Sequence, residues 1–274
     1  MAAKQFSTSN IRNIALVGHG GCGKTTLADA MLYVSGSVGR LGKVGDKTSV
    51  LDFEPEEHKR GGTIGTSLAW VEHDGNKINV LDTPGDANFI YDSINSMMGA
   101  DAALILISAP DGVEVQTERV HTVARSTGLP RIVMINKMDR DRADHEACLS
   151  DIEDSFGVQP VPLQIPIGKE QDFKGYISLF KMRAFTFDGT NGKATEGDIP
   201  ADLMDEAEAA REGLVEAVAS ADDALLEQYL ETFELSQSQV QDGFRKALKS
   251  GEILPVIYGA AESCIGVSSV LELV

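Results

Sequence analysis

Short apolar runs alternate with longer amphipathic stretches over the first half of the chain. Brief apolar runs bounded by polar residues or glycine indicate buried strands, and apolar residues three or four positions apart indicate helices. The pattern predicts strands at 11–17, 66–72, 77–81, 102–108 and 131–135, and helices at 25–34, 89–98, 113–127 and 142–155. This alternation is typical of an α/β fold with a doubly wound, mostly parallel sheet.

The pattern changes near Gly168. Residues 174–187 are expected to form two strands, 188–192 a turn, and about 201–219, 222–233 and 236–249 three helices. One face of the first of these helices is predicted to carry Leu203, Ala207, Ala210, Leu214 and Val218. We therefore predict a P-loop GTPase domain at 1–167 and 252–274, interrupted by an inserted α+β subdomain at 168–251.

The GTPase prediction begins with a glycine-rich segment between the first strand and the first helix, Gly18-His19-Gly20-Gly21-Cys22-Gly23-Lys24-Thr25. Glycines let the backbone N–H groups turn inward on a phosphate at the positive end of a helix dipole. Lys24 is placed to reach the β- and γ-phosphates, and the Thr25 hydroxyl to bind Mg²⁺. Cys22 is expected to fill space within this loop.

A long polar stretch, residues 35–62, lacks periodicity and precedes Thr63. A γ-phosphate and Mg²⁺ can order such a loop through one threonine. Thr63 alone is more simply an ordinary loop threonine, and the neighbouring motifs favour the phosphate role. Asp82 follows a predicted strand whose hairpin turn is Asp74-Gly75, and it is expected to hold the Mg²⁺ shell. The Gly85 N–H is expected to approach the γ-phosphate.

Base recognition is predicted for Asn136-Lys137-Met138-Asp139, at the end of the strand 131–135. The Asp139 carboxylate can accept hydrogen bonds from two guanine N–H donors, which adenine does not offer. Asn136 is expected to brace the loop and the Lys137 stem to lie over the base. The small residues Gly259-Ala260-Ala261, which begin 120 positions after Asp139, would let a backbone N–H meet the guanine carbonyl oxygen.

These expectations define three sets of candidate residues. The catalytic candidates are Lys24, Thr63, Gly85 and Asp86. The Mg²⁺ candidates are Thr25, Thr63 and Asp82. The candidates for binding GTP or GDP are Gly18, His19, Gly20, Gly21, Cys22, Gly23, Lys24, Thr25, Thr26, Asp82, Gly85, Asn136, Lys137, Asp139, Gly259, Ala260 and Ala261.

Net charge, cysteine spacing and apolar segments exclude some classes of protein. The 274 residues carry a formal net charge of -18, which argues against a broad electrostatic grip on nucleic acid. Residues 196–234 hold 13 acidic residues and one basic residue, and form either a solvated helical surface or a docking surface for a basic protein. Three cysteines without disulfide spacing, and the lack of a signal peptide or an apolar membrane span, predict a cytoplasmic protein without disulfides or membrane contact.

Taken together, the phosphate loop, Lys59-Arg60-Gly61-Gly62-Thr63-Ile64, Asp82-Thr83-Pro84-Gly85, Asn136-Lys137-Met138-Asp139 and the long insertion resemble the GTPase domain of translation elongation factor G. The resemblance covers nearly the whole chain. It implies further domains that engage the ribosome, and an insertion that touches the ribosomal stalk protein. The chain ends within a predicted amphipathic helix, 268–274, which also favours a longer protein.

Four positions depart from the family pattern. Gly21 stands where the family carries Asp, Gly62 where it carries Ile, Asp86 where it carries His, and Ala260 where it carries Ser. The resemblance is therefore to an elongation factor G-like paralogue that keeps the binding residues and has lost residues tied to catalysis. Two hypotheses follow: a Mg²⁺-dependent GTPase stimulated by the ribosome, or a nucleotide-occupancy switch with little hydrolysis of its own.

Overall fold

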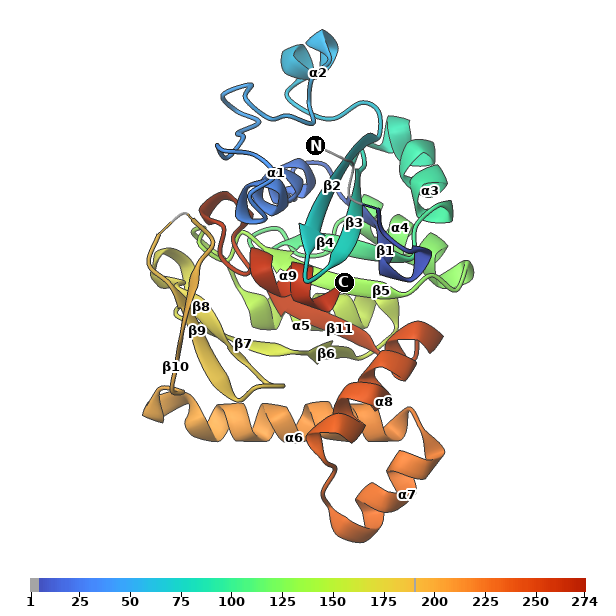
Figure 1. The fold of residues 1–274 in the computed structure, drawn as a ribbon, viewed down its shortest axis with the longest axis vertical. Helices are drawn as coiled ribbons and strands as arrows, with labels where there is room; N and C mark the ends of the chain where they lie inside the picture. Colours follow the sequence, from blue (N-terminus) through green and yellow to red (C-terminus); the bar gives the residue numbers. More distant parts are fainter. Residues whose placement is uncertain (1–4, 190) are drawn as a thin grey trace.

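A computed structural model describes residues 5–189 and 191–274, and its strands form two sheets (Figure 1). The larger sheet has the order β2-β3-β1-β4-β5-β11-β6, and the smaller has the order β10-β9-β8-β7. The strands of the larger sheet are β1 Ile11–Gly18, β2 Ser67–His73, β3 Asn76–Asp82, β4 Ala102–Ser108, β5 Arg131–Asn136, β6 Pro160–Pro162 and β11 Leu254–Tyr258. Those of the smaller sheet are β7 Gln164–Ile167, β8 Gly175–Ser178, β9 Arg183–Phe187 and β10 Ala194–Gly197.

Helices lie on both faces of the larger sheet (Figure 1). The α-helices are α1 Lys24–Val34, α2 Pro55–Arg60, α3 Ile90–Met98, α4 Val115–Ser126, α5 His145–Phe156, α6 Met204–Ser220, α7 Asp223–Thr232, α8 Gln237–Ser250 and α9 Val267–Leu273. Short 3₁₀ turns are η1 Thr8–Asn10, η2 Ala87–Phe89, η3 Glu170–Asp172, η4 Ala201–Leu203 and η5 Ala261–Ser263.

Strand β1 shows why this sheet is covered on both faces. Ile14 and Leu16 pack into a core that includes α1 and α9, whereas Ala15 and Val17 pack into a second core that includes α3, α4 and α5. Side chains alternate across a strand, so an unbroken apolar run supplies both cores. All neighbouring pairs of the sheet are parallel except β2 with β3. The doubly wound, mostly parallel sheet is confirmed.

The position of β1 also places the functional segments. The strand lies between β3 and β4. These two strands are consecutive in the chain but lie on opposite sides of β1 in the sheet. Such a switch point leaves a crevice at the carboxyl ends of the strands, where ligands of this fold class bind. The predicted hairpin is present as well, with positive φ angles at Asp74 (44°) and Gly75 (80°), as a tight hairpin turn requires.

The antiparallel sheet is followed along the chain by helices α6, α7 and α8, which lie at the bottom of Figure 1. Ala207, Leu214 and Val218 of α6 are buried, in agreement with the predicted apolar face. Helix α8 begins with a capping box between Ser236 and Gln239. The predicted turn at 188–192 includes Thr190, which lies outside the described residues.

Four elements were not anticipated: α2, β6, β7 and β10. Helix α2 has no apolar periodicity and depends instead on a capping box between Glu54 and Glu57, with Pro55 in the first turn. The three strands have only three or four residues each, too few to show a period. Because β7 pairs with β8 although it precedes residue 168, the division at 168 stays a prediction.

In the part of the chain that the structure describes, no helix has the length and apolar character needed to cross a bilayer. The three cysteines are buried free thiols.

The buried guanidinium of Arg131 joins the larger sheet to helix α8. Arg131, at the start of β5, donates to the carbonyl oxygen of Gly251 (2.8 Å), at the carboxyl end of α8. Its guanidinium also lies 3.1 Å from His121 Nε2, and the imidazole stacks on Phe156 with ring centroids 3.9 Å apart. Burial, together with Arg131 and Arg125, lowers the pKa of His121 to about 4. His121 is therefore neutral in the folded protein at neutral pH.

We predict that His121 makes the fold sensitive to acid. The unfolded chain takes up a proton near pH 6.5 and the folded chain only near pH 4, so the free energy of unfolding falls as the pH drops through this interval. His121→Gln keeps an acceptor for Arg131 but does not titrate. Urea unfolding from pH 7 to pH 4 should show the unmodified protein losing up to about 3 kcal/mol more than the variant. Parallel pH profiles would contradict the prediction.

Candidate functional site

The glycine-rich loop lies at the carboxyl end of β1 and leads directly into α1. Gly18 and Gly23 have φ angles of 142° and 101°, which side chains disfavour. A Cβ on Gly18 would lie 2.5 Å from the carbonyl oxygen of Leu106, so β4 leaves no room for one. Glycine is therefore required at both positions by conformation and, at Gly18, by close packing.

Lys24 is buried at the centre of this loop. Its ammonium donates to the carbonyl oxygens of Gly18 (3.0 Å) and His19 (2.8 Å). The loop is tied to α4 by the His19 N–H, which lies 3.2 Å from Thr117 Oγ1. Burial raises the pKa of the Cys22 thiol, which fits its expected role as a space-filler. The Lys24 ammonium is thus held inside the loop by two backbone carbonyl oxygens.

Thr63 lies beside the first turn of α1. Its hydroxyl oxygen is 2.9 Å from that of Thr25, and it donates to the Asp52 carboxylate (3.1 Å). Asp52 is buried, and burial raises its pKa. Asp52 was not among the sequence candidates, because a lone aspartate in a polar loop gives no pattern. The structure therefore brings two of the three Mg²⁺ candidates together and adds a carboxylate.

Asp82, the third Mg²⁺ candidate, is completely buried at the end of β3. Neither of its carboxylate oxygens has a hydrogen-bond partner among the described residues. Burial raises its pKa to about 7, while the nearby Thr25 hydroxyl and Lys24 ammonium act in the opposite direction. An unpaired buried carboxylate is costly, and a bound cation would remove that cost.

Gly85 packs directly against the phosphate loop. A Cβ there would lie 2.4 Å from Lys24 Nζ and 2.6 Å from the N atom of Gly20, so a larger residue would displace one segment or the other. The loop that carries Gly85 is anchored to β1 and to α3. Thr83 Oγ1 donates to the Leu16 carbonyl (2.7 Å), and Ser93 Oγ donates to the Pro84 carbonyl (2.6 Å).

Asp86 is partly exposed and has two sets of partners. It accepts hydrogen bonds from the N–H and the side-chain amide of Asn88 (2.8 Å each), and it forms an ion pair with Arg60. These contacts, led by the Asn88 N–H, hold the pKa of Asp86 below its ordinary value. No local pattern in the sequence predicts this ion pair between Asp86 and Arg60.

Asn136 connects the phosphate loop to the loop that follows β11. Its amide nitrogen donates to the Cys22 carbonyl (2.9 Å), and its amide oxygen accepts from the Ala261 N–H (2.9 Å). The same nitrogen would lie 2.4 Å from a Cβ on Gly23, a further reason for glycine there. Asn136 thus braces the loop as predicted and extends that brace to a third segment.

Asp139 lies on the loop that follows β5. Its carboxylate accepts a hydrogen bond from Ser263 Oγ (2.7 Å), and the adjacent Arg140 forms an ion pair with Glu262. Lys137 adopts a left-handed backbone, with φ of 62°. Gly259 is close-packed, since a Cβ there would lie 2.7 Å from the Ile265 carbonyl oxygen. Ser263 was missed because its contact depends on a loop 124 positions away.

A cavity of about 440 Å³ opens between these segments. It is lined by Gly20, Gly21, Gly23, Lys24, Thr25, Thr26, Val44, Asp52, Arg60, Gly61, Gly62, Thr63, Gly85 and Asp86. The catalytic candidates and the phosphate loop therefore share one cavity, whereas Asn136, Asp139 and Ala260 lie beyond its lining.

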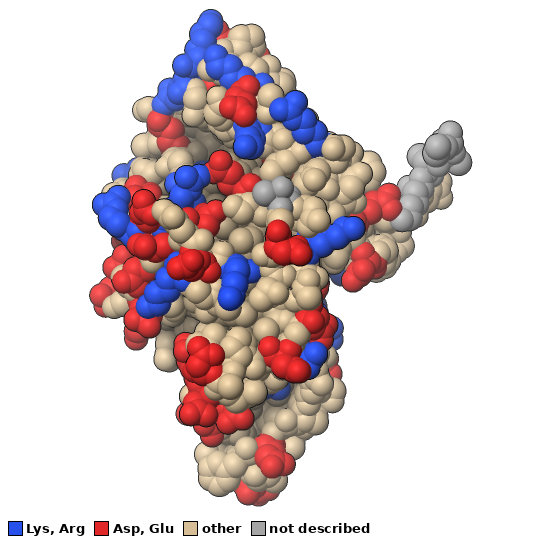
Figure 2. Space-filling view, turned by 90° about the vertical axis from the view of Figure 1, so that its left-hand side faces the viewer, with Lys and Arg blue, Asp and Glu red and all other residues tan. Residues whose placement is uncertain are grey.

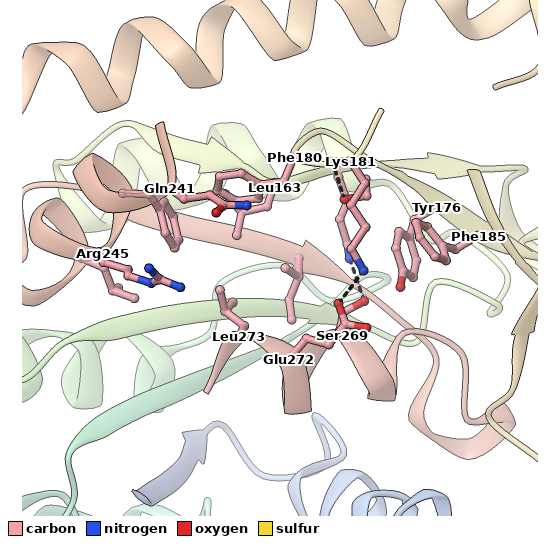
Figure 3. Close-up of a pocket in the computed structure, with 15 residues that line it drawn as sticks. Leu163, Tyr176, Phe180, Lys181, Phe185, Gln241, Arg245, Ser269, Glu272 and Leu273 are labelled. Atoms are coloured by element: carbon pink, nitrogen blue, oxygen red, sulfur yellow. Dashed lines mark hydrogen bonds and ion pairs between the residues drawn. The ribbon is translucent and has the colours of Figure 1, made fainter. Parts of the chain in front are cut away.

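A second cavity of about 290 Å³ lies between the smaller sheet, α8 and α9 (Figure 3). It is lined mainly by apolar and aromatic side chains, among them Tyr176 and Phe185, and its Lys181 is paired with Glu272 at 3.0 Å. None of the candidate residues lines it. We therefore place the candidate site at the first cavity.

Comparisons with known proteins identify the family of the chain. The family model described as elongation factor Tu GTP binding domain matches residues 9–274. The crystal structure of ttk003000868 from Thermus thermophilus is similar over 97% of this chain, with 35% sequence identity and a TM-score of 0.90. This chain spans 40% of the length of that one. With a sequence match over almost its whole length, the chain belongs to the family of the elongation factor Tu GTP binding domain, a family of GTP-binding translation-factor GTPases.

Proposed function

We propose that this chain is the nucleotide-binding domain of an elongation factor G-like translation factor, binding GTP and GDP with Mg²⁺ and hydrolysing GTP slowly to GDP and phosphate. Residues 1–167 and 252–274 form the GTPase domain in this proposal, and 168–251 the inserted subdomain. The observation that carries the proposal is the position of Asn136, whose amide joins the phosphate loop to the Ala261 loop. This brace sets the phosphate and base ends at a fixed separation.

The phosphate end is assigned to Gly18, His19, Gly20, Gly21, Cys22, Gly23, Lys24, Thr25 and Thr26. Backbone N–H groups of this loop would surround the β-phosphate, and the buried Lys24 would neutralise charge on the β- and γ-phosphates. Among the described residues, the Lys24 ammonium forms hydrogen bonds with two carbonyl oxygens and the Cys22 sulfur, and no ion pair with a carboxylate competes with phosphate.

Thr25, Thr63 and Asp82 are assigned to Mg²⁺. Two adjacent hydroxyls and a buried, unpaired carboxylate form a hard oxygen donor set, which Mg²⁺ prefers. Asp52 accepts a hydrogen bond from the Thr63 hydroxyl and would orient that hydroxyl. When bound by these residues, Mg²⁺ would supply positive charge that offsets the negative charge developing during hydrolysis.

The base end is assigned to Asn136, Lys137, Asp139 and the loop Gly259-Ala260-Ala261. The Asp139 carboxylate is oriented by Ser263 and keeps acceptor capacity for two guanine N–H donors. Adenine would leave the remaining acceptor positions of this carboxylate without donors, and this loss disfavours adenine.

Slow hydrolysis is proposed from the position of Asp86. Its carboxylate is already engaged by Arg60 and Asn88, so it is poorly placed to orient an attacking water. Arg60 offsets part of the repulsion that an isolated Asp86 would exert on the γ-phosphate. Engagement of the side chain, rather than repulsion alone, is therefore the stronger reason to expect a low rate.

The second candidate function is a nucleotide-occupancy switch, favoured by the same engagement of Asp86. In this alternative the state of segments near Thr63 and Gly85 carries the signal, and hydrolysis is negligible or is supplied by a partner.

The proposed partner is the ribosome, including its stalk protein, and this proposal rests on the resemblance to the family. The proposed location of the protein is the cytoplasm. Asp and Glu side chains gather over the lower part of the molecule, where the inserted helices lie (Figure 2). A groove between α6 and α7 combines acidic residues with apolar side chains, including Phe233, whose side chain is 75% exposed. This combination supports docking of a basic protein surface, and a solvated helical surface remains the alternative.

Base choice should depend on Asp139. Asp139→Asn should weaken GDP binding by about tenfold to hundredfold, because the variant loses a charged acceptor, and should admit xanthosine diphosphate. Displacement of labelled GDP by each nucleotide measures this, with Asp141→Asn as the matched control on an exposed neighbour. Equal displacement by ATP and GTP from the unmodified chain would refute the assignment.

GTP hydrolysis by the isolated chain should be slow. Unassisted GTPases that keep a water-positioning glutamine turn over at about 10⁻⁴ to 10⁻³ s⁻¹, and we expect a rate at or below this range. Single-turnover hydrolysis of bound GTP, with and without added ribosomes, is the measurement, and ribosomes should accelerate the enzyme but not an occupancy switch. A partner-free rate near 5–20 s⁻¹, roughly that of activator-assisted GTPases, would overturn the interpretation of Asp86.

A further inference from the structure

Two segments of the chain meet across the mouth of the phosphate cavity. Segment 35–66 contains α2 and Thr63, and segment 83–89 contains Gly85 and η2. Arg60 at the end of α2 pairs with Asp86 at the start of η2, and both side chains line the cavity. Among the ion pairs found between described residues, this is the one that joins these two segments.

Both partners are held in place by further contacts. The Arg60 guanidinium lies over the Phe89 ring, with its central carbon 5.1 Å from the ring centroid. Asp86 caps η2 by accepting the Asn88 N–H. Holding two side chains in one geometry is a main cost of an exposed ion pair, and prior fixation lowers that cost.

Arg60 is connected to Thr63 through a short, well-anchored stretch of backbone. The Gly61 N–H donates to the Glu57 carbonyl (2.7 Å), and the Ile64 N–H donates to the Glu57 carboxylate (3.0 Å). Glu57 is itself buried. Thr63 therefore lies between two anchors, the Arg60 side chain on one side and the Ile64 amide on the other.

We propose that Arg60 and Asp86 form a positioning pair that holds the Thr63 segment against the Gly85 segment and so slows the release of a nucleoside triphosphate. The inference rests on the proposed function, because Thr63 and Gly85 are both assigned to the γ-phosphate end. A diphosphate, which lacks that phosphate, depends less on the pair. Asp86, which departs from the family pattern, thereby serves in closure of the site.

The size of the effect follows from the exposure of the pair. The Arg60 and Asp86 side chains are 44% and 36% exposed. Exposed ion pairs change an equilibrium by about fivefold at most. We therefore expect changes of roughly two- to fivefold rather than loss of binding.

The first test measures hydrogen exchange at the Ile64 amide in the protein without added nucleotide. The variants are Arg60→Gln, Asp86→Asn and the double variant, and Asn at position 86 can still cap η2. Each single variant should speed exchange about two- to fivefold, and the double variant no more than either single variant. Arg183→Gln, which breaks the remote ion pair with Asp198, should leave this amide unchanged.

The second test measures dissociation of a fluorescent non-hydrolysable GTP analogue and of fluorescent GDP, both with Mg²⁺. The Arg60 and Asp86 variants should release the triphosphate about two- to fivefold faster and change GDP release less. A purely structural role would change both nucleotides alike. Additive effects in the double variant, or unchanged triphosphate release, would overturn the pairing. If the unmodified chain binds neither nucleotide, the proposed function fails, and unchanged Ile64 exchange would separately refute the pair itself.

Discussion

The side-chain amide of Asn136 is the contact on which the rest of the site depends. It is buried at the end of β5, where it donates to Cys22 in the phosphate loop and accepts from Ala261 in the loop after β11. Leaving buried hydrogen-bonding groups unpaired costs about 1–3 kcal/mol each, so the three segments favour one arrangement. Gly23 is part of the same constraint, because Asn136 occupies the space that a Cβ would need. Asn136 therefore links three segments that lie far apart in sequence.

The contacts between segments 35–66 and 83–89 differ from this buried brace. Segments 35–66 and 83–89 meet through the exposed Arg60–Asp86 pair and the hydroxyls of Thr25 and Thr63. Beneath them lies Asp82, whose carboxylate is buried without a hydrogen-bond partner in the described structure. Such an arrangement is costly alone and suits occupancy by a cation and phosphate. The site thus combines a buried amide brace at Asn136 with an exposed ion pair between Arg60 and Asp86.

Much of the fold was predictable because its strands are long, apolar and followed by characteristic residues. The positions of β1, β3, β4 and β5 along the chain, and the residues at their carboxyl ends, could be predicted from period and spacing alone. Helix α2 was missed because a six-residue charged helix is specified by its caps, Glu54 and Glu57, rather than by an apolar face. Asp52 and Ser263 were missed for another reason: each acts through a tertiary hydrogen bond that no local pattern signals.

The most direct test of the account is the affinity of Asn136→Ala for GDP with Mg²⁺, measured by titration calorimetry. The substitution removes both hydrogen bonds while Asp139, Lys24 and Thr25 remain. We expect the variant to stay folded, as judged by its unfolding transition, and to bind GDP at least about a hundredfold more weakly. A folded variant that binds GDP within about twofold of the unmodified chain would contradict the claim that Asn136 holds the two ends of the site together.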